Sequence, residues 1–147
     1  MTPRPRPEAL HERRVFVLDS EALSKTTRGD RVMLARINKA WQSKSPVVTS
    51  ALTTLEAWDP RPARAARLWE WAMSRIAVVH TDDTIIAEAR SLLKAAGLHG
   101  HKYAIDAVLA AVALAEARKR RQVTVLTSDA DDLERLLAGH PVVVAPV

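Results

Sequence analysis

The sequence contains no cysteine among its 147 residues. Disulfide bonds, cysteine-based zinc sites and thiol nucleophiles are therefore all excluded. Any metal ion bound by this chain must be held by oxygen atoms or by imidazole groups. The histidines show no metalloprotease spacing, and the pair His99 and His101 is typical of a loop, so oxygen ligands are favoured.

Long apolar runs are absent as well. The longest, AVLAAVALA at residues 107–115, falls far below the roughly 20 residues that span a bilayer. The first residues, MTPRPRPEALHERR, carry positive charge without an apolar segment behind them, which is not the pattern of a secretory signal. We therefore expect a cytoplasmic protein without membrane contact, in which residues 1–13 form a flexible basic arm.

The overall composition of the chain is typical of a globular protein. Hydrophobic residues make up 48% of the chain, and the length suits one domain, which we expect over residues 14–147. Lys and Arg number 22 against 17 Asp and Glu, which gives a formal net charge of +5. Such a surface attracts polyanions, so nucleic acid is a candidate partner that composition alone does not establish.

Strand and helix patterns alternate along the chain. Strands are predicted at residues 14–19, 45–50, 76–80, 122–128 and 141–147. Helices are predicted at residues 20–25, 30–42, 51–58, 63–75, 81–97, 101–121 and 130–139. Because the strands are continuously apolar, we expect a three-layer α/β/α sandwich with a central, mainly parallel sheet of four to five strands.

Acidic residues follow several of the predicted strands. In open α/β sheets, ligands bind beyond the carboxyl ends of the strands. Asp19 ends the first strand, Asp129 follows the strand at 122–128, and Glu56 lies two turns after the second strand. Asp106 lies in the first turn of the long apolar helix. We expect these four carboxylates to converge on one edge of the sheet.

Each acid also has a purely structural interpretation. Asp19 can cap the helix that begins at Ser20, and Glu56 can be an exposed helix residue. Asp106 is harder to explain in this way, because its neighbours are apolar and a buried carboxylate needs a partner or a metal ion. A helix terminus alone contributes less than about 1 kcal/mol when exposed.

The stretch LTSDADDLERL at residues 126–136 holds three carboxylates in four positions. Asp129 directly follows the strand and is the predicted ligand. Asp132 stands three residues later, where an acid reaches back to the helix start in a capping box. Asp131 is predicted to be solvated. Either Asp131 or Asp132 remains a possible additional acid of the site.

Several carboxylates brought together repel one another unless a cation compensates their charge. Oxygen ligands favour Mg²⁺ or Mn²⁺, as one or two ions. On a basic protein, such ions suggest phosphodiester hydrolysis, because a metal ion activates water and stabilises charge on the phosphate.

Four segments in order, VLDSEAL, VTSALTTLEAW, YAIDAVLAAVAL and VLTSDADDLERL, resemble the PIN-domain ribonucleases, most closely the VapC-like toxins of type II toxin–antitoxin pairs. The resemblance runs from about Val15 to the carboxyl terminus. It implies a metal-dependent endoribonuclease, a homodimer and inhibition by a cognate antitoxin. By position, the catalytic and metal-binding acids are Asp19, Glu56, Asp106 and Asp129.

The resemblance extends to hydroxyl residues beside the acids. Ser20 and Thr127 match small hydroxyl residues that flank the family's acids, and are candidates to bind metal-bound water. Glu21 departs from the family, which usually has a small or polar residue at this position. The basic arm before the first strand is a second departure, and neither removes an acid.

Basic and aromatic side chains are candidates for contact with RNA or a partner. These are Arg13, Arg14, Arg28, Arg31, Arg64, Arg67, Trp71 and Lys102. By their position in sequence, Arg13, Arg14, Arg28, Arg31 and Lys102 are expected near the acids as phosphate contacts. On the helix at 63–75, helical spacing predicts Trp69 in the core and Trp71 on a basic face. Trp71 then suits base stacking or a protein contact, or it simply lies flat under arginine side chains. The RKRR run at residues 118–121 ends the apolar helix and is too far along it to act beside Asp106.

Two other functions are compatible with an α/β fold of this kind. A phosphoacceptor or phosphatase domain also places Asp at strand ends, but here the first strand is followed by Asp19, Ser20 and Glu21 rather than a D-x-D pair. A receiver domain would need a late lysine, and no lysine follows Lys119. A PIN-fold binding module with a vestigial metal site is the second alternative, which metal titration would test.

Overall fold

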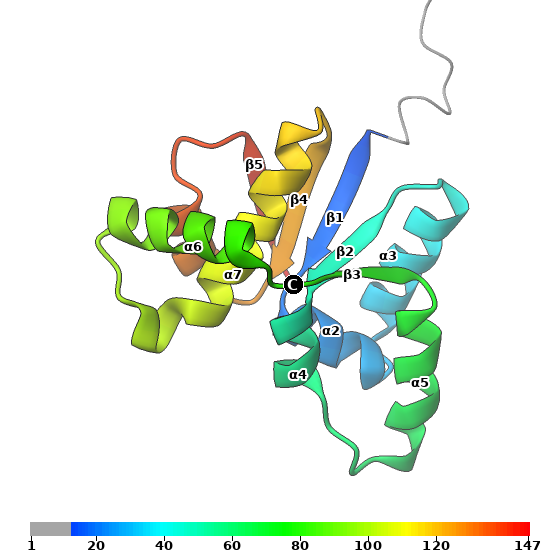
Figure 1. The fold of residues 1–147 in the computed structure, drawn as a ribbon. Coiled ribbons are helices and arrows are strands. Elements are labelled where there is room, and N and C mark those ends of the chain that lie inside the picture. Colours follow the sequence, from blue (N-terminus) through cyan, green and yellow to red (C-terminus); the bar gives the residue numbers. More distant parts are fainter. Residues whose placement is uncertain (1–12) are drawn as a thin grey trace, which may run out of the picture.

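The computed structural model describes residues 13–147, and its centre is a parallel sheet (Figure 1). The strands are β1 (Arg14–Leu18), β2 (Val47–Ser50), β3 (Ile76–Val79), β4 (Gln122–Thr127) and β5 (Val142–Pro146). Their order across the sheet is β3-β2-β1-β4-β5, and every neighbouring pair is parallel. The predicted sandwich with a parallel sheet of four to five strands is confirmed.

The register places the ends of the two central strands side by side. Phe16 pairs with Val47 on one side and with Thr124 on the other, and Leu18 pairs with Leu126. The chain runs outward from β1 to β3 and then returns to place β4 on the opposite side of β1. The strand order therefore reverses between β1 and β4, where an open α/β sheet forms its ligand crevice.

Helices cover both faces of the sheet, as Figure 1 shows. On one side lie α2 (Ser20–Thr27), α3 (Arg31–Gln42) and α5 (Ala63–Met73), with the short α4 (Ala51–Ala57) beside α2. The other side carries α6 (Asp83–Ala96), α7 (Gly100–Arg118) and α8 (Ala130–Leu136). Each predicted helix is present, with ends that differ from the predicted ones by a few residues.

Short-range signals explain where these helices begin and end. Asp30, Ser50 and Asp82 are N-caps whose side chains accept the backbone N–H three residues later. Helix α6 ends at Gly97 with φ of 67°, a left-handed conformation that suits glycine. Several predicted ends extended too far because capping residues were counted inside the helix.

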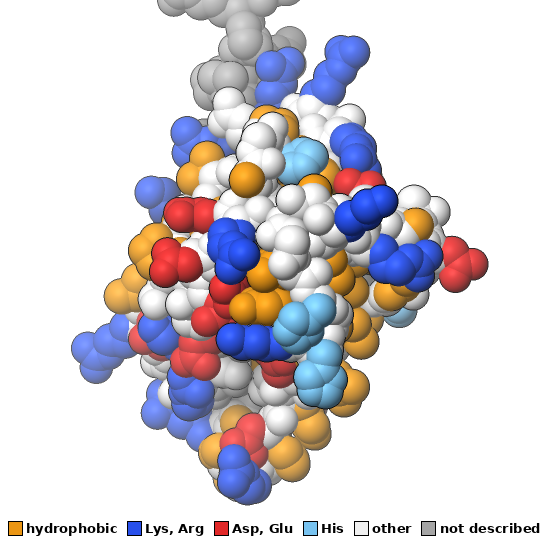
Figure 2. Space-filling view, turned by 90° about the vertical axis from the view of Figure 1, so that its left-hand side faces the viewer, with side chains coloured by type: hydrophobic (Ala, Val, Ile, Leu, Met, Phe, Trp, Pro, Cys, Tyr) orange, Lys and Arg blue, Asp and Glu red, His pale blue; other side chains and the backbone are white. Residues whose placement is uncertain are grey.

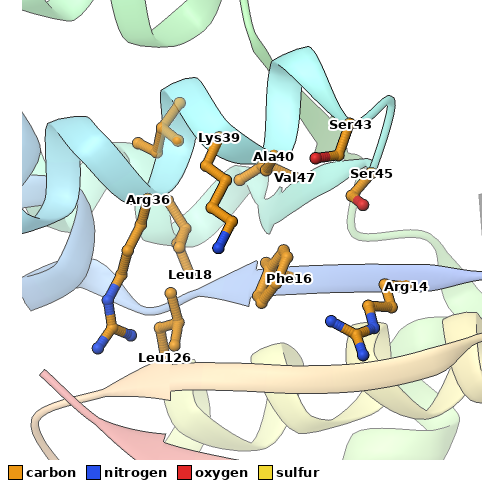
Figure 3. Close-up of a pocket in the computed structure, with 11 residues that line it drawn as sticks. Arg14, Phe16, Leu18, Arg36, Lys39, Ala40, Ser43, Ser45, Val47 and Leu126 are labelled. Carbon is orange, nitrogen blue, oxygen red and sulfur yellow. The ribbon is translucent and has the colours of Figure 1, made fainter. Parts of the chain in front are cut away.

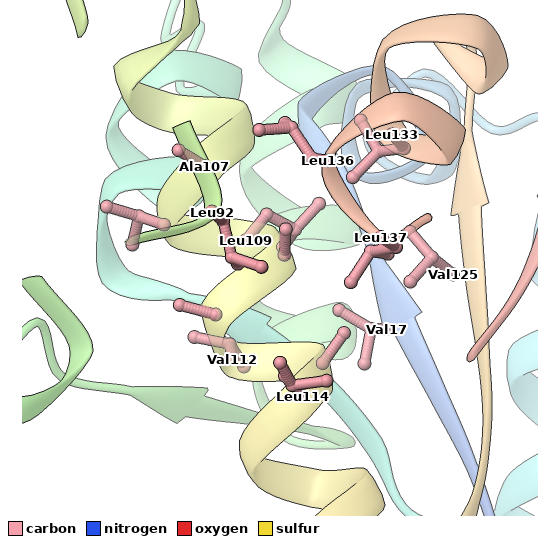
Figure 4. Packing of buried hydrophobic residues seen from close by; sticks show 14 of the residues in the cluster. Val17, Leu92, Ala107, Leu109, Val112, Leu114, Val125, Leu133, Leu136 and Leu137 are labelled. Atoms are coloured by element: carbon pink, nitrogen blue, oxygen red, sulfur yellow. The ribbon is translucent and has the colours of Figure 1, made fainter. Parts of the chain in front are cut away.

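The sheet separates two apolar cores. On one face, Val15, Val17 and Val125 pack against α6, α7 and α8, whose leucines are shown in Figure 4. On the other face, Leu18, Val47 and other side chains pack against α2, α3 and α5. Residues 107–114 of α7 are buried on all sides, so the central position predicted for this helix is confirmed. Its burial also brings Asp106, the residue just before this stretch, against the sheet's edge.

The predicted amino-terminal arm lies outside the described residues, apart from Arg13. The Arg13 carbonyl accepts a hydrogen bond from the Gln122 N–H, which extends the pairing of β1 with β4 by one residue. Within residues 13–147, no helix is both long and apolar enough to cross a bilayer.

The tryptophans of α5 differ from their predicted roles. Trp69 is half-buried rather than fully in the core, and it meets Trp58 edge to face with ring centroids 4.9 Å apart. Trp71 packs against the same apolar core as Trp69, and the Arg75 guanidinium lies 4.4 Å from its ring centroid. Arg75 therefore lies over the ring, as the structural alternative describes, and a contact of Trp71 with RNA or a partner stays a prediction.

The packing of α7 predicts that a cavity in the core between the sheet and α6, α7 and α8 strongly lowers the stability of the protein. Leu109→Ala removes a side chain that is 1% exposed, so it should lower the free energy of unfolding by roughly 2–5 kcal/mol. Leu55→Ala, at a leucine that is 73% exposed, is the matched control and should change it by less than about 0.5 kcal/mol. Urea denaturation of both variants measures the difference, and equal stabilities would contradict the assigned core.

Candidate functional site

Asp19 stands at the carboxyl end of β1 and joins three elements. Its Oδ1 accepts the Ala22 N–H at 2.7 Å, so the residue does cap α2 as the structural interpretation predicted. Its Oδ2 accepts the Thr127 hydroxyl at 2.6 Å and the Ser128 N–H at 3.0 Å. The side chain is nearly fully buried, and these donors compensate the loss of water around its charge.

Thr127 connects the ends of β1 and β4. Its hydroxyl donates to Asp19 Oδ2 and accepts the Asp129 N–H at 2.8 Å. Thr127 is fully buried, and its only hydroxyl hydrogen is directed at Asp19. In this arrangement its role is to position both acids.

Ser20 connects α2 to α4. Its hydroxyl donates to Oε1 of Glu56 in a short hydrogen bond. Glu56 is exposed, as its structural interpretation expected, yet this bond holds its carboxylate next to the residue that follows Asp19. The predicted approach of Glu56 to the first acid is therefore present.

Asp106 is the point where the charges of the site meet. Burial is the largest effect that raises its pKa, and the charges of Asp129, Asp132, Asp19 and Glu56 add to it in this order of strength. Together these effects raise the pKa of Asp106 to about 6. Such effects require the groups to lie near one another. Asp19, Glu56 and Asp129 therefore lie near enough to Asp106 for their charges to act on it, and their grouping as one site stays a prediction.

Asp129 and Asp132 divide their roles differently from the prediction. The Asp129 N–H, which a capping box would pair with Asp132, donates to Thr127 Oγ1 instead. The capping role predicted for Asp132 is therefore wrong, because the strand end supplies an acceptor first. Half-buried Asp132 instead raises the pKa of both Asp106 and Asp129. Asp131 is exposed, as expected of a solvated carboxylate.

Glu21 also belongs to the acidic edge, although it was noted in the sequence only as a departure from the family. Burial, followed by the charges of Asp19, Asp132 and Glu21, raises the pKa of Asp129. Glu21 forms a 2.7 Å ion pair with Arg28. Its spacing of two residues from Asp19 on the start of a helix was the signal available in the sequence.

The predicted basic contacts separate into two groups. Lys102 lowers the pKa of Asp129, and Arg28 binds Glu21, so both lie by the acids. Neither Arg31 nor Arg67 is among the charges that shift the pKa of Asp106 or Asp129. Arg64 places its guanidinium against Gly29 in the turn between α2 and α3.

Arg13 and Arg14 were predicted near the acids and are not there. Arg14 begins β1 and pairs with Gln122, whereas Asp19 follows the far end of the same strand. Five strand residues span about 16 Å, so nearness in sequence did not mean nearness at the edge. Arg14 instead borders a hollow of about 270 Å³ between α3 and the sheet, with Arg36 and Lys39 on the same rim (Figure 3).

Charges of both signs are interspersed on the side that carries α6, α7 and α8, as Figure 2 shows. The net charge of +5 thus does not produce a uniformly basic surface there. Positive charge near the acids comes from particular residues such as Lys102 and Arg28.

The acids suit a hard divalent cation by their chemistry, because all are carboxylates, and burial followed by their mutual repulsion raises the pKa values of Asp106 and Asp129. Within residues 13–147, however, no three Asp, Glu or His side chains are grouped closely enough to hold one ion. Asp19 is already fixed and keeps lone pairs on Oδ1 beyond its one bond to Ala22.

A parallel sheet with acids at its point of strand reversal defines an α/β protein with an acidic crevice. The sequence matches the PIN domain family over residues 16–137, so the chain belongs to this family. PIN domains are nucleases, which supports a hydrolase that acts on nucleic acid. The family assignment disfavours a receiver or phosphatase domain.

One solved structure with a similar fold is described as VapBC2 from Rickettsia felis bound to a DNA fragment from their promoter. It aligns with a TM-score of 0.66 and 12% sequence identity, covering 90% of this chain and 98% of the matched chain. At this identity the likeness concerns the fold. A search of curated proteins finds no match.

The raised pKa of Asp106 predicts that removing its charge increases the stability of the folded protein in a pH-dependent way. Since the folded protein binds the Asp106 proton more tightly than the unfolded chain, stability falls as pH rises from about 4 to 6. Asp106→Asn should therefore stabilise the metal-free protein at pH 7 by about 1–2 kcal/mol, allowing for solvent screening. Urea denaturation in EDTA at pH 4 and pH 7 checks this, and a gain that is the same at both values would contradict it.

The hydrogen bonds of the Thr127 hydroxyl predict that its removal lowers the stability of the protein more than removal of another threonine hydroxyl on β4 does. Thr127→Val leaves Asp19 without one donor and the Asp129 N–H without its acceptor, so the free energy of unfolding should fall by about 1–3 kcal/mol. Thr124→Val, on the same strand, is the matched control with a smaller effect expected. Thermal unfolding of both variants is the measurement, and the reverse ranking would rule out the bridge.

Proposed function

We propose that this protein is a divalent-metal-dependent endoribonuclease. The observation that carries the proposal is the convergence of Asp19, Glu56, Asp106 and Asp129 where the strand order reverses. These acids come from β1, α4, α7 and the end of β4, so only the folded chain assembles them. Their chemistry suits Mg²⁺ or Mn²⁺, as one or two ions.

When bound, the metal would supply an activated water molecule and charge to offset that of the phosphate. The protein residues would fix the geometry. Asp19 is held by three donors and would be the rigid ligand. Ser20 would orient Glu56, and Thr127 would orient Asp19 and Asp129. Asp106, with a pKa of about 6, is mostly ionised at pH 7, and a bound cation would offset its charge.

Positive side chains would hold the substrate outside the acids. Lys102 stands close enough to Asp129 to lower its pKa and is placed to contact a phosphate. Arg28 is exposed and paired only at the surface with Glu21, so a phosphate can compete for its guanidinium. RNA, rather than DNA, is proposed from the family resemblance of the four acidic segments.

We further propose that the nuclease is the toxin of a toxin–antitoxin pair, active as a homodimer and inhibited by a cognate antitoxin. The support is the resemblance to VapC-like toxins, together with a fold shared with a chain of the VapBC2 structure. A short reading frame beside the gene, encoding a protein with a DNA-binding pattern, is the candidate antitoxin. Co-expression of the two proteins should yield a complex that lacks nuclease activity.

Cleavage of labelled total RNA tests the proposed activity. Purified protein with Mg²⁺ or Mn²⁺ should cleave RNA, and EDTA should abolish the cleavage. Asp106→Asn should reduce the rate by at least about 100-fold, because loss of a ligand exceeds the effect of losing an outer partner.

Asp131→Asn is the matched control, since Asp131 is an exposed acid on α8 and no source of the shifts at Asp106. It should cleave RNA at the wild-type rate. Absence of cleavage by partner-free protein, together with absence of metal binding in a titration, would favour a PIN-fold binding module with a vestigial site.

A further inference from the structure

A hollow of about 510 Å³ lies next to the acidic edge and shares Glu56 with it. Its walls come from the end of α2, the end of α4 and the segment that leads into α5. The side chains that matter are Arg28, Trp58 and Arg61, with the hydroxyl residues Ser24 and Thr27 behind them. From this geometry we propose that the hollow binds a nucleotide of single-stranded RNA next to the scissile phosphate, with its base stacked on Trp58. The inference rests on the proposed nuclease function.

Trp58 offers a ring that is both accessible and fixed in place. It is 49% exposed, and Trp69 meets it edge to face at 4.9 Å between ring centroids, with 76° between the planes. A contact of this kind holds the indole while leaving a face open. An open, fixed aromatic ring is the usual platform for an unpaired base, because stacking costs little when the ring is already ordered.

The segment after Trp58 forms a preformed wall. Pro60 and Pro62 restrict the backbone there, and Arg61 binds Asp59 through Nε and Nη2, both at 2.8 Å. The Arg61 N–H also donates to Asp59 at 3.1 Å. The hollow therefore needs no large rearrangement to accept a ligand.

Arg28 links the hollow to the acids. It lines the hollow, while its guanidinium binds Glu21, whose charge acts on Asp129. A phosphate held by Arg28 would stand on the border between the hollow and the acidic edge, as the backbone of a nucleotide beside the scissile bond must.

Single-stranded RNA fits these features better than a duplex does. In a duplex the bases are already stacked on one another and present only their edges, so an exposed indole gains nothing from them. A protein segment is the rival occupant, and it would bury Trp58 together with neighbouring apolar residues such as the exposed Leu55. The test separates these two occupants.

The test measures binding of a short single-stranded oligoribonucleotide, in EDTA so that no cleavage occurs, through the fluorescence anisotropy of a dye on the oligonucleotide. Trp58→Ala should weaken binding about 5- to 150-fold, the range expected for loss of one stacked base. Trp58→Phe should restore most of the affinity. Trp41→Ala is the matched control, because Trp41 is also exposed, at 55%, but lies at the end of α3 and does not line this hollow. It should bind as the wild type does.

A cleavage assay adds a second readout. Trp58→Ala should raise KM with little change in kcat, since the indole lies outside the acids. Unchanged RNA affinity of Trp58→Ala would overturn the proposal, as would an equal loss in Trp41→Ala. A change in oligomeric state without a change in RNA affinity would assign Trp58 to a protein contact instead.

The two proposals fail in different ways. Binding that depends on Trp58, without any metal-dependent cleavage, would keep the nucleotide site and overturn the nuclease. Cleavage that is indifferent to Trp58 would keep the nuclease and overturn the nucleotide site.

Discussion

The carboxylate of Asp19 is the constraint on which the rest of the acidic edge depends. It begins α2 through the Ala22 N–H, and it fastens the end of β4 through Thr127 and Ser128. Because the same Thr127 hydroxyl accepts the Asp129 N–H, the first and fourth acids are positioned by one shared group. A charged side chain with three donors can remain ionised when buried, so it is the fixed point around which less ordered ligands arrange.

The carboxylate of Asp106, unlike that of Asp19, is destabilised in its charged form by its surroundings. Asp106 is half-buried, and burial followed by the charges of the nearby carboxylates raises its pKa to about 6. Natural proteins keep such unfavourable arrangements where function needs them. The stability lost here is recovered from the two apolar cores, above all from α7, whose buried middle section holds Asp106 at the edge of the sheet.

The sequence was a good guide to the elements and a weaker guide to distances. Continuous apolar strands and capped helices predicted the sheet, and the acids that follow the strands predicted the edge where Asp19 and Asp129 meet. The place of Arg14 was missed because nearness in sequence ignores the length of a strand. The role of Asp132 was missed because Thr127 takes the Asp129 N–H, a competition that periodicity does not reveal.

The parallel order of the strands also has a consequence for how the protein is made. Asp19 and its partner Thr127 are separated by 108 positions. Strand β4 can pair with β1 only after helices α2 to α7 have been synthesised. A chain still emerging from the ribosome therefore carries its first three acids without the strand that clamps them. The hydrogen bonds that position Asp19 and Asp129 can therefore form only once the chain has been made as far as Asp129.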